Sequence, residues 1–131
     1  MFLNRLNGNE KIAFLTLANH LARSDGDFSQ NEKSIIATYC LEMQIKDVAY
    51  SEKEFNLNRI LEEVENTESQ KIILLEMMAL VYADGLQEEE QNILNVIIEK
   101  FNISESIAVV YAEWSQSILS ISRQGQALIK L

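Results

Sequence analysis

Acidic side chains gather at two places where an apolar helical run is interrupted by Asp-Gly. We call these places the first corner, residues 24–32, and the second corner, residues 83–90. Their candidate site residues are Asp25, Asp27 and Glu32 in the first corner and Asp84 and Glu90 in the second. Carboxylate oxygens are the ligands of hard divalent cations such as Ca²⁺, Mg²⁺ or Mn²⁺, and they also attract basic protein surfaces. The sequence therefore predicts an acidic binding site at the corners.

The spacing within the first corner matches the second half of an EF-hand loop. Asp25, Gly26, Phe28 and Glu32 stand at the intervals of that loop's Asp, turn glycine, apolar residue and final Glu. The first half of the loop is missing, and a hard cation takes about six or more oxygens. A metal would need ligands from the second corner or water as well, so we expect weak affinity, on the order of 10⁻⁴ M or weaker.

Ordinary helix ends explain the same residues without a ligand. Asp-Gly is a common helix stop, with the glycine in the left-handed conformation. Ser29 and Glu32 form the sequence pattern of a capping box, and acids in the first turn of a helix suit its dipole. The second corner is one residue shorter and has Gln87 where Ser29 stands. An equal role for the two corners does not follow, and both interpretations stay open.

Two further residues could carry chemistry. Glu76 is the only charge in the apolar segment 72–83, so it is either a functional buried carboxylate, or exposed, or paired with a Lys or Arg. A metal-dependent hydrolase using the corner carboxylates with Glu76 is the enzymatic alternative, but the Glu-x-x-His pairs of di-metal bundles are missing. His20 has no Cys or His partner at ligand spacing, which argues against zinc.

The corners belong to a repeated unit of helix, Asp-Gly and helix. Asp25-Gly26 recurs as Asp84-Gly85, and Glu32 recurs as Glu90, which suggests an internal duplication. Helical spacing predicts helices over residues 10–24, 30–43, 57–64, 72–83, 88–101 and from 105 onward, with Gly125 as a kink or an end. Expected caps are Asn9, a box over 51–54, a box over 67–70, and Ser104.

Composition supports an all-α fold in a single domain over residues 1–131. The chain has 47% hydrophobic residues, no proline and only four glycines. Its formal net charge of −9 disfavours nucleic acid and anionic lipid as partners. The lone Cys40 suits a reducing compartment, and neither a secretory leader nor an apolar run of ~18 residues is present. We therefore expect a cytoplasmic protein with no direct membrane insertion.

The two corner sequences resemble those of the tellurite-resistance TerB-like family. The matching segments are residues 21–32, LARSDGDFSQNE, and residues 75–85, LEMMALVYADG, followed by three glutamates. The resemblance implies a compact bundle of about seven helices, a stress-response context and no established enzymatic activity. It also implies that the acidic corners bind metal ions or partners. A related domain occurs in a membrane-anchored DnaJ-like co-chaperone, but this chain shows no J-domain or anchor.

These observations predict a non-enzymatic binding or sensing module. Its acidic surface would bind a divalent cation or a basic protein partner. A purely structural interaction domain is the remaining alternative. The oligomeric state does not follow from the sequence.

Overall fold

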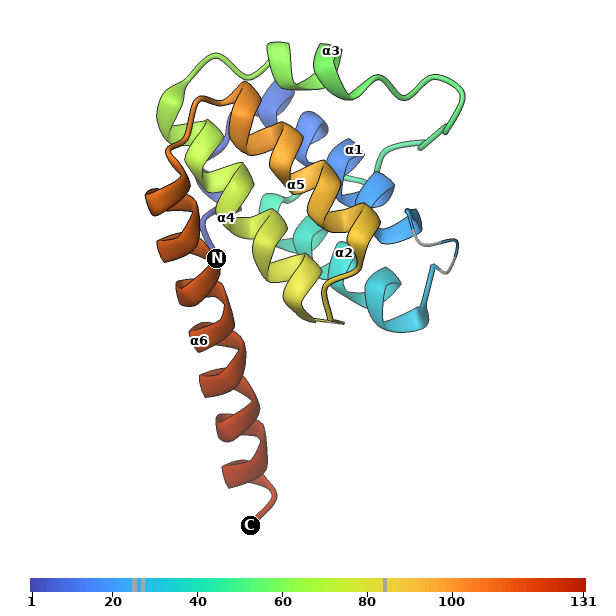
Figure 1. Cartoon of the computed structure of the whole chain (residues 1–131). Helices are drawn as coiled ribbons and strands as arrows, with labels where there is room; N and C mark the ends of the chain where they lie inside the picture. The colour runs from blue at the N-terminus through green and yellow to red at the C-terminus, as the bar shows by residue number, and fades with distance from the viewer. Residues whose placement is uncertain (25, 27, 84) are drawn as a thin grey trace.

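The computed structural model describes residues 1–24, 26, 28–83 and 85–131 of the chain, and these residues form helices and loops without a strand. A short 3₁₀ helix, η1, precedes six α-helices (Figure 1). Their bounds are η1 Leu3–Arg5, α1 Gly8–Arg23, α2 Gln30–Met43, α3 Leu57–Glu62, α4 Thr67–Ala83, α5 Glu88–Lys100 and α6 Glu105–Ile129. The predicted all-α class is confirmed, but six α-helices replace the expected seven.

The helices begin where short polar side chains accept backbone N–H groups. Asn7 caps α1 in a capping box with Glu10, so the prediction of Asn9 as this cap was wrong. Ser29 and Glu32 form the predicted box of α2, with both hydrogen bonds at 3.1 Å. Such boxes satisfy backbone donors that the first helical turn otherwise leaves unpaired. The sequence pattern therefore located the start of α2 correctly.

Two other predicted boxes are absent because asparagines take their place. The Asn66 side chain accepts the Ser69 N–H at 2.9 Å at the start of α4, one residue before the predicted cap. Residues 51–54 form a turn instead of a helix start, and Asn56 caps α3 by accepting from Arg59 at 3.1 Å. Asparagine is as good a cap as serine, so the pattern alone did not separate the two.

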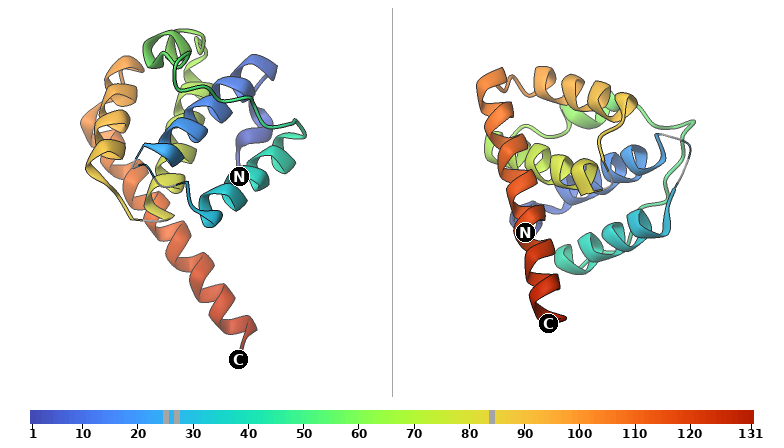
Figure 2. Two further views of the ribbon diagram at one scale, coloured as in Figure 1. Left: turned by 90° about the vertical axis from the view of Figure 1, so that its right-hand side faces the viewer. Right: turned by 60° about the horizontal axis from the view of Figure 1, so that its bottom comes forward.

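Helix α4 is the centre of the bundle. It packs against α1, α5, α6 and η1 (Figures 1 and 2), while α1 also packs against α2 and α3. The α4 side chains Ile73, Leu74, Met77 and Val81 are each 0% exposed. A helix that is apolar nearly all round is buried on most sides, and α4 confirms that expectation. It fixes the positions of both corners, because α1 and α5 lie on either side of it.

The two corners share one backbone feature. Gly26 has φ +82° and Gly85 has φ +87°, both in the left-handed region that glycine adopts without steric cost. The predicted pair of positive-φ glycines is therefore confirmed. Each glycine follows a helix of one unit, α1 or α4, and precedes its second helix, α2 or α5. This equivalence supports the interpretation of the chain as a duplicated unit.

Helix α6 is the longest element, with 25 residues, and it continues through Gly125 without ending there. Its first half packs against α4, and its second half extends away from the rest of the molecule (Figures 1 and 2). No helix within the described part of the chain is both long enough and apolar enough to cross a membrane.

Candidate functional site

The predicted site residues fall into two groups in the structure. Asp25, Asp27 and Asp84 lie outside the described residues, so their part in a site stays a prediction. Glu32 and Glu90 lie at equivalent places, in the first turn of α2 and of α5, and each is only 7% exposed. These two carboxylates are held against the protein by local contacts.

Both glutamates act as helix-capping groups. The Glu32 carboxylate accepts the Ser29 N–H, and the Glu90 carboxylate accepts the Gln87 N–H, each at 3.1 Å. Glu10 does the same for Asn7 at the start of α1, at 2.9 Å, although it belongs to no corner. A carboxylate at this position therefore serves the helix start wherever it occurs, and a cation would have to share it with the backbone.

The structure brings the two corners to one cleft. A cavity of about 700 Å³ opens between them, with Gly26 and Phe28 of the first corner on one side. The α5 residues Glu89, Asn92 and Ile93 line it on the side of the second corner. We call this cavity the corner cleft. The sequence predicted that a cation at the first corner would need ligands from the second corner or water, and that stays a prediction, while described residues of both corners line this cleft.

His20 and Tyr50 line the corner cleft next to α1, and Phe55, which does not line the cleft, stacks on His20. The His20 ring lies parallel to the Phe55 ring, with centroids 3.7 Å apart. His20 Nδ1 is 2.7 Å from the Tyr50 hydroxyl, so one of the two groups donates a hydrogen bond to the other. Burial lowers the pKa of His20 below its usual value, against a smaller opposing effect of Glu52. The imidazole is therefore neutral near pH 7.

Arg23 lies one turn after His20 and carries the positive charge of the corner cleft. Its guanidinium carbon is 4.1 Å from the centroid of the Phe28 ring and 5.1 Å from that of the Tyr50 ring. Such cation–π contacts fix a flexible arginine in one place. Among the described residues that line the cleft, Glu52 and Glu89 are acidic and both are exposed, so the cleft presents both signs of charge beside aromatic surface.

The loop that supplies Tyr50 and Phe55 is tied to α1. Asn19, which is 1% exposed, donates to the Asp47 carboxylate and to the Leu15 carbonyl, both at 2.9 Å. Asp47 also accepts the Val48 N–H at 2.8 Å. Breaking the hydrogen bonds of the buried Asn19 side-chain amide would be costly. These hydrogen bonds therefore hold the loop over the corner cleft.

Sequence reasoning missed this half of the cleft. Arg23, Tyr50 and Glu52 were not candidates, because Arg23 belongs to the first predicted helix and residues 45–56 have no helical period and no pattern beyond the expected box over 51–54. The available signal was two aromatic residues in a polar, irregular segment, which a packed wall or a binding surface explains. A metal centre lacks support from the same residues, since no three His, Cys, Asp or Glu side chains in the described ranges are grouped as ligands.

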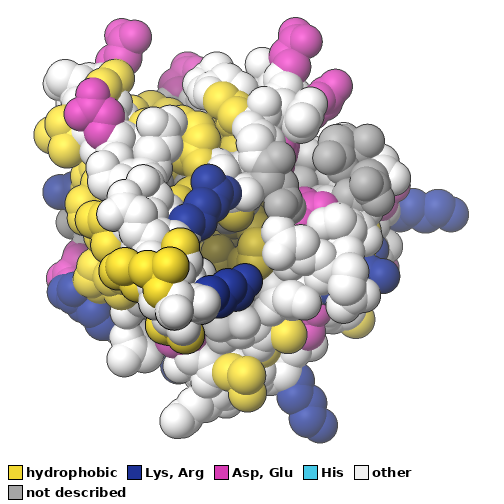
Figure 3. All heavy atoms as spheres, turned by 90° about the horizontal axis from the view of Figure 1, so that it is seen from below, with side chains coloured by type: hydrophobic (Ala, Val, Ile, Leu, Met, Phe, Trp, Pro, Cys, Tyr) yellow, Lys and Arg dark blue, Asp and Glu magenta, His cyan; other side chains and the backbone are white. Residues whose placement is uncertain are grey.

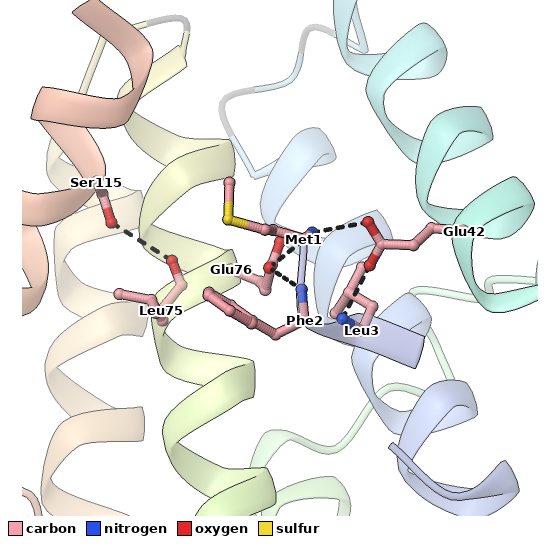
Figure 4. A network of polar contacts seen from close by, with 7 residues as sticks. All are labelled: Met1, Phe2, Leu3, Glu42, Leu75, Glu76 and Ser115. Atoms are coloured by element: carbon pink, nitrogen blue, oxygen red, sulfur yellow. Dashed lines mark hydrogen bonds and ion pairs between the residues drawn. The ribbon is translucent and has the colours of Figure 1, made fainter. Parts of the chain in front are cut away.

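Glu76 lies elsewhere, on α4 beneath the start of the chain (Figure 4). Its carboxylate, 7% exposed, accepts from the Met1 ammonium and from the Phe2 N–H, both at 3.0 Å. Glu42 of α2 accepts from the same ammonium at 2.7 Å and from the Leu3 N–H at 2.8 Å. The buried carboxylate is therefore paired. Its partners are the Met1 ammonium and the Phe2 N–H, and not the Lys or Arg side chain that the sequence suggested.

These contacts shift two pKa values in the same direction. Burial lowers the pKa of the Met1 ammonium, but the hydrogen bonds and charges of Glu42 and Glu76 outweigh it and raise that pKa overall. Burial, with smaller effects of the same two carboxylates, raises the pKa of Tyr39 far above its usual value. Glu76 thus holds η1 against the bundle, about which the sequence alone gave no information.

Comparison with known proteins does not assign this chain to a family. No protein-family model, no curated protein and no solved structure matches this chain. The TerB-like resemblance accordingly rests on the corner sequences, and it stays a hypothesis.

Proposed function

We propose that this protein is a non-enzymatic binding module whose corner cleft binds a basic segment of a partner protein. The observation that carries the proposal is the cleft of about 700 Å³ that both corners line, with Glu52 and Glu89 exposed in it. A concave site with a few converging polar groups is the usual form of a binding site. The net charge of −9 favours a basic ligand over nucleic acid or another acidic partner.

The chemistry of the cleft suits a peptide with lysine or arginine side chains. Glu52 and Glu89 would accept those basic groups, while the Arg23 guanidinium would donate to a backbone carbonyl of the same segment. Arg23 is already held by the rings of Phe28 and Tyr50, so little side-chain freedom is lost when it binds. The preformed wall and the exposed acids together favour an extended basic segment.

The biological context of the proposal comes from the family resemblance. If the chain is TerB-like, the module works in a stress-response system of the tellurite-resistance kind, and we place it in the cytoplasm, where the lone Cys40 would stay reduced. A divalent cation at Asp25, Asp27 and Glu32, with help from the second corner, stays a second prediction. Its support is the half-EF spacing together with the paired left-handed glycines.

Calorimetric titration with a ten-residue peptide of alternating lysine and serine tests the proposal. We expect binding at low salt that weakens as salt is added, because the contacts are between exposed charges. The double variant Glu52→Gln with Glu89→Gln should lose most of the affinity. The control, Glu65→Gln with Glu99→Gln, removes two exposed charges away from the cleft and should bind like the wild type. Equal losses in both variants would show a non-specific effect of net charge and would refute the proposal.

Two further titrations separate the alternatives. Ca²⁺, Mg²⁺ and Mn²⁺ are added to the metal-free protein, and the double variant Asp25→Asn with Asp84→Asn should abolish any heat if the corners hold the ion. Metal-dependent hydrolysis of a phosphoester by the wild type, lost in the same variant, would replace the binding module by the hydrolase.

A further inference from the structure

Helix α6 has an apolar surface that only part of the molecule covers. Its first half contacts α4 through small side chains: Ala108 is 8% and Ser115 is 0% exposed, and the Ser115 hydroxyl donates to the Leu75 carbonyl at 3.5 Å (Figure 4). Arg123 donates to the Ala83 carbonyl at 3.2 Å. Beyond that point Leu128 and Ile129 are 67% and 82% exposed. The helix therefore carries large apolar groups that the described part of the chain leaves uncovered.

A regular line of mostly apolar residues runs along the helix, in which Ile107, Ile121 and Leu128 are exposed and the other members are half-buried. Steps of four and three residues alternate without a break through Ile107, Tyr111, Trp114, Ile118, Ile121, Gly125 and Leu128. We call these seven residues the α6 stripe. Alternating steps of four and three are the a and d positions of a coiled coil, and they fit a second helix packed alongside. The stripe thus indicates a helical partner more than a flat surface.

The stripe continues into an apolar groove on the body of the molecule. The groove, about 390 Å³, is lined by the apolar side chains of Phe2, Ile72, Leu75, Val110, Tyr111 and Trp114, together with Arg5, Glu68 and Lys71. The Phe2 and Trp114 rings meet there at 5.9 Å between centroids. Seen from below, hydrophobic side chains are grouped on the side of the molecule where α6 lies (Figure 3). A partner helix on the stripe would therefore also reach the groove.

Gly125 indicates which partner packs on the stripe. It lies inside α6, where glycine is unfavourable compared with alanine, and a Cβ added to it would meet nothing within 4 Å. No contact with the described residues therefore requires a glycine there. If a second copy packs antiparallel with its Ile121 opposite Ile118, its Gly125 lies opposite Trp114 and its Leu128 opposite Tyr111. The smallest residue of the stripe then faces the largest, which is the size match that close helix packing needs.

The charges of α6 favour the same antiparallel arrangement. Glu105 and Glu113 lie in the first half of α6. Arg123 lies in its second half, and Lys130 follows its last residue. Antiparallel packing places the basic end of one copy along the acidic end of the other, whereas parallel packing would align like charges. The two helix dipoles are also antiparallel. An anionic membrane surface suits this helix less well, because the two acids lie on the same helix and the chain carries −9.

We propose that the α6 stripe is a self-association surface, on which a second copy of this chain packs its own α6 antiparallel. The dimer would leave the corner cleft free, because the residues that line the cleft come from α1, α5 and the loops beside them. It would also present two corner clefts in one particle. A partner with two basic segments would then bind with an avidity that one cleft cannot provide.

Sedimentation velocity of the full chain from about 1 to 500 µM tests the proposal. We expect a monomer–dimer equilibrium that tightens as salt is added, because two copies of charge −9 repel each other. Ile121, 61% exposed in one copy, is replaced in Ile121→Glu, which should weaken the dimer about 100-fold or more. The control Gln116→Glu adds the same charge at an exposed position off the stripe and should dimerise nearly as the wild type does.

Gly125→Leu gives a second and independent variant. It should weaken dimerisation while the monomer keeps its helix content, since a Cβ added at this position meets nothing within 4 Å in one copy. In the wild type the fluorescence of Trp114, the only tryptophan, should move to shorter wavelength as the dimer forms. A monomer at every concentration overturns the proposal. So does a dimer that persists in both stripe variants, or a monomer that binds phosphatidylcholine vesicles through the stripe instead.

Discussion

Replacing Glu76 by alanine should destabilise the protein through one small contact region. The change leaves the Phe2 N–H without its acceptor and removes one of the two carboxylates beside the Met1 ammonium. A hydrogen bond to a charged group contributes about 1.5–3 kcal/mol, and the Phe2 N–H bond falls in that range because Glu76 is 7% exposed. The Met1 ammonium is half exposed and keeps its ion pair with Glu42. The loss of its ion pair with Glu76 therefore adds less than about 1 kcal/mol.

The expected total is about 3 kcal/mol, which lowers the melting temperature of a domain of this size by roughly 10–15 °C. Urea unfolding at low protein concentration, followed by circular dichroism, measures the free energy of unfolding. Trp114 emission should also move to longer wavelength, because Phe2 contacts that ring and loses its anchor. Glu113→Ala, the same change at an exposed position of α6, is the control. A Glu76→Ala protein within ~0.5 kcal/mol of the control would refute the structural role of this carboxylate.

Three other perturbations have definite expected outcomes. Gly26→Ala and Gly85→Ala should each lower the free energy of unfolding by about 1–2 kcal/mol in thermal melts, because both glycines have positive φ. An NMR titration should give His20 a pKa below about 6.5, the value of the unfolded chain. Since the unfolded state then binds the proton first, stability should fall as pH drops below ~6.5, and less so in His20→Gln. Asn66→Ala should cost about 1 kcal/mol in urea unfolding, whereas Thr67→Ala should change little, because Asn66 caps α4.

The sequence predicted those features that depend on residues close together along the chain. The helical class, the box of Ser29 with Glu32 and the left-handed glycines at both corners follow from local spacing, and the structure has them. The helix count was wrong. Asn7 and Asn66 replaced neighbouring residues as caps, because several polar side chains at a helix start compete for the same backbone donors.

What the sequence missed depends on contacts between distant residues. His20 and Phe55 stack across 35 positions, and the pairing of Glu76 with the start of the chain spans 75. Neither has a local pattern, since an irregular loop and a chain start are placed only by the packed bundle. The corner acids were found by spacing, but two of them, Glu32 and Glu90, cap helices as the plainer interpretation predicted. A ligand role for the corner acids stays a prediction.

The central claim, that the corner cleft is where the protein binds its partner, is tested most directly by NMR. A lysine-rich peptide is titrated into ¹⁵N-labelled protein, and the amide shifts are mapped onto the structure. We predict that the largest shifts occur at Gly26, Phe28, Tyr50, Glu89 and Asn92, which line the cleft. Shifts confined to the α6 stripe or spread evenly over the exposed acids, with the cleft residues unchanged at saturating peptide, would contradict the account.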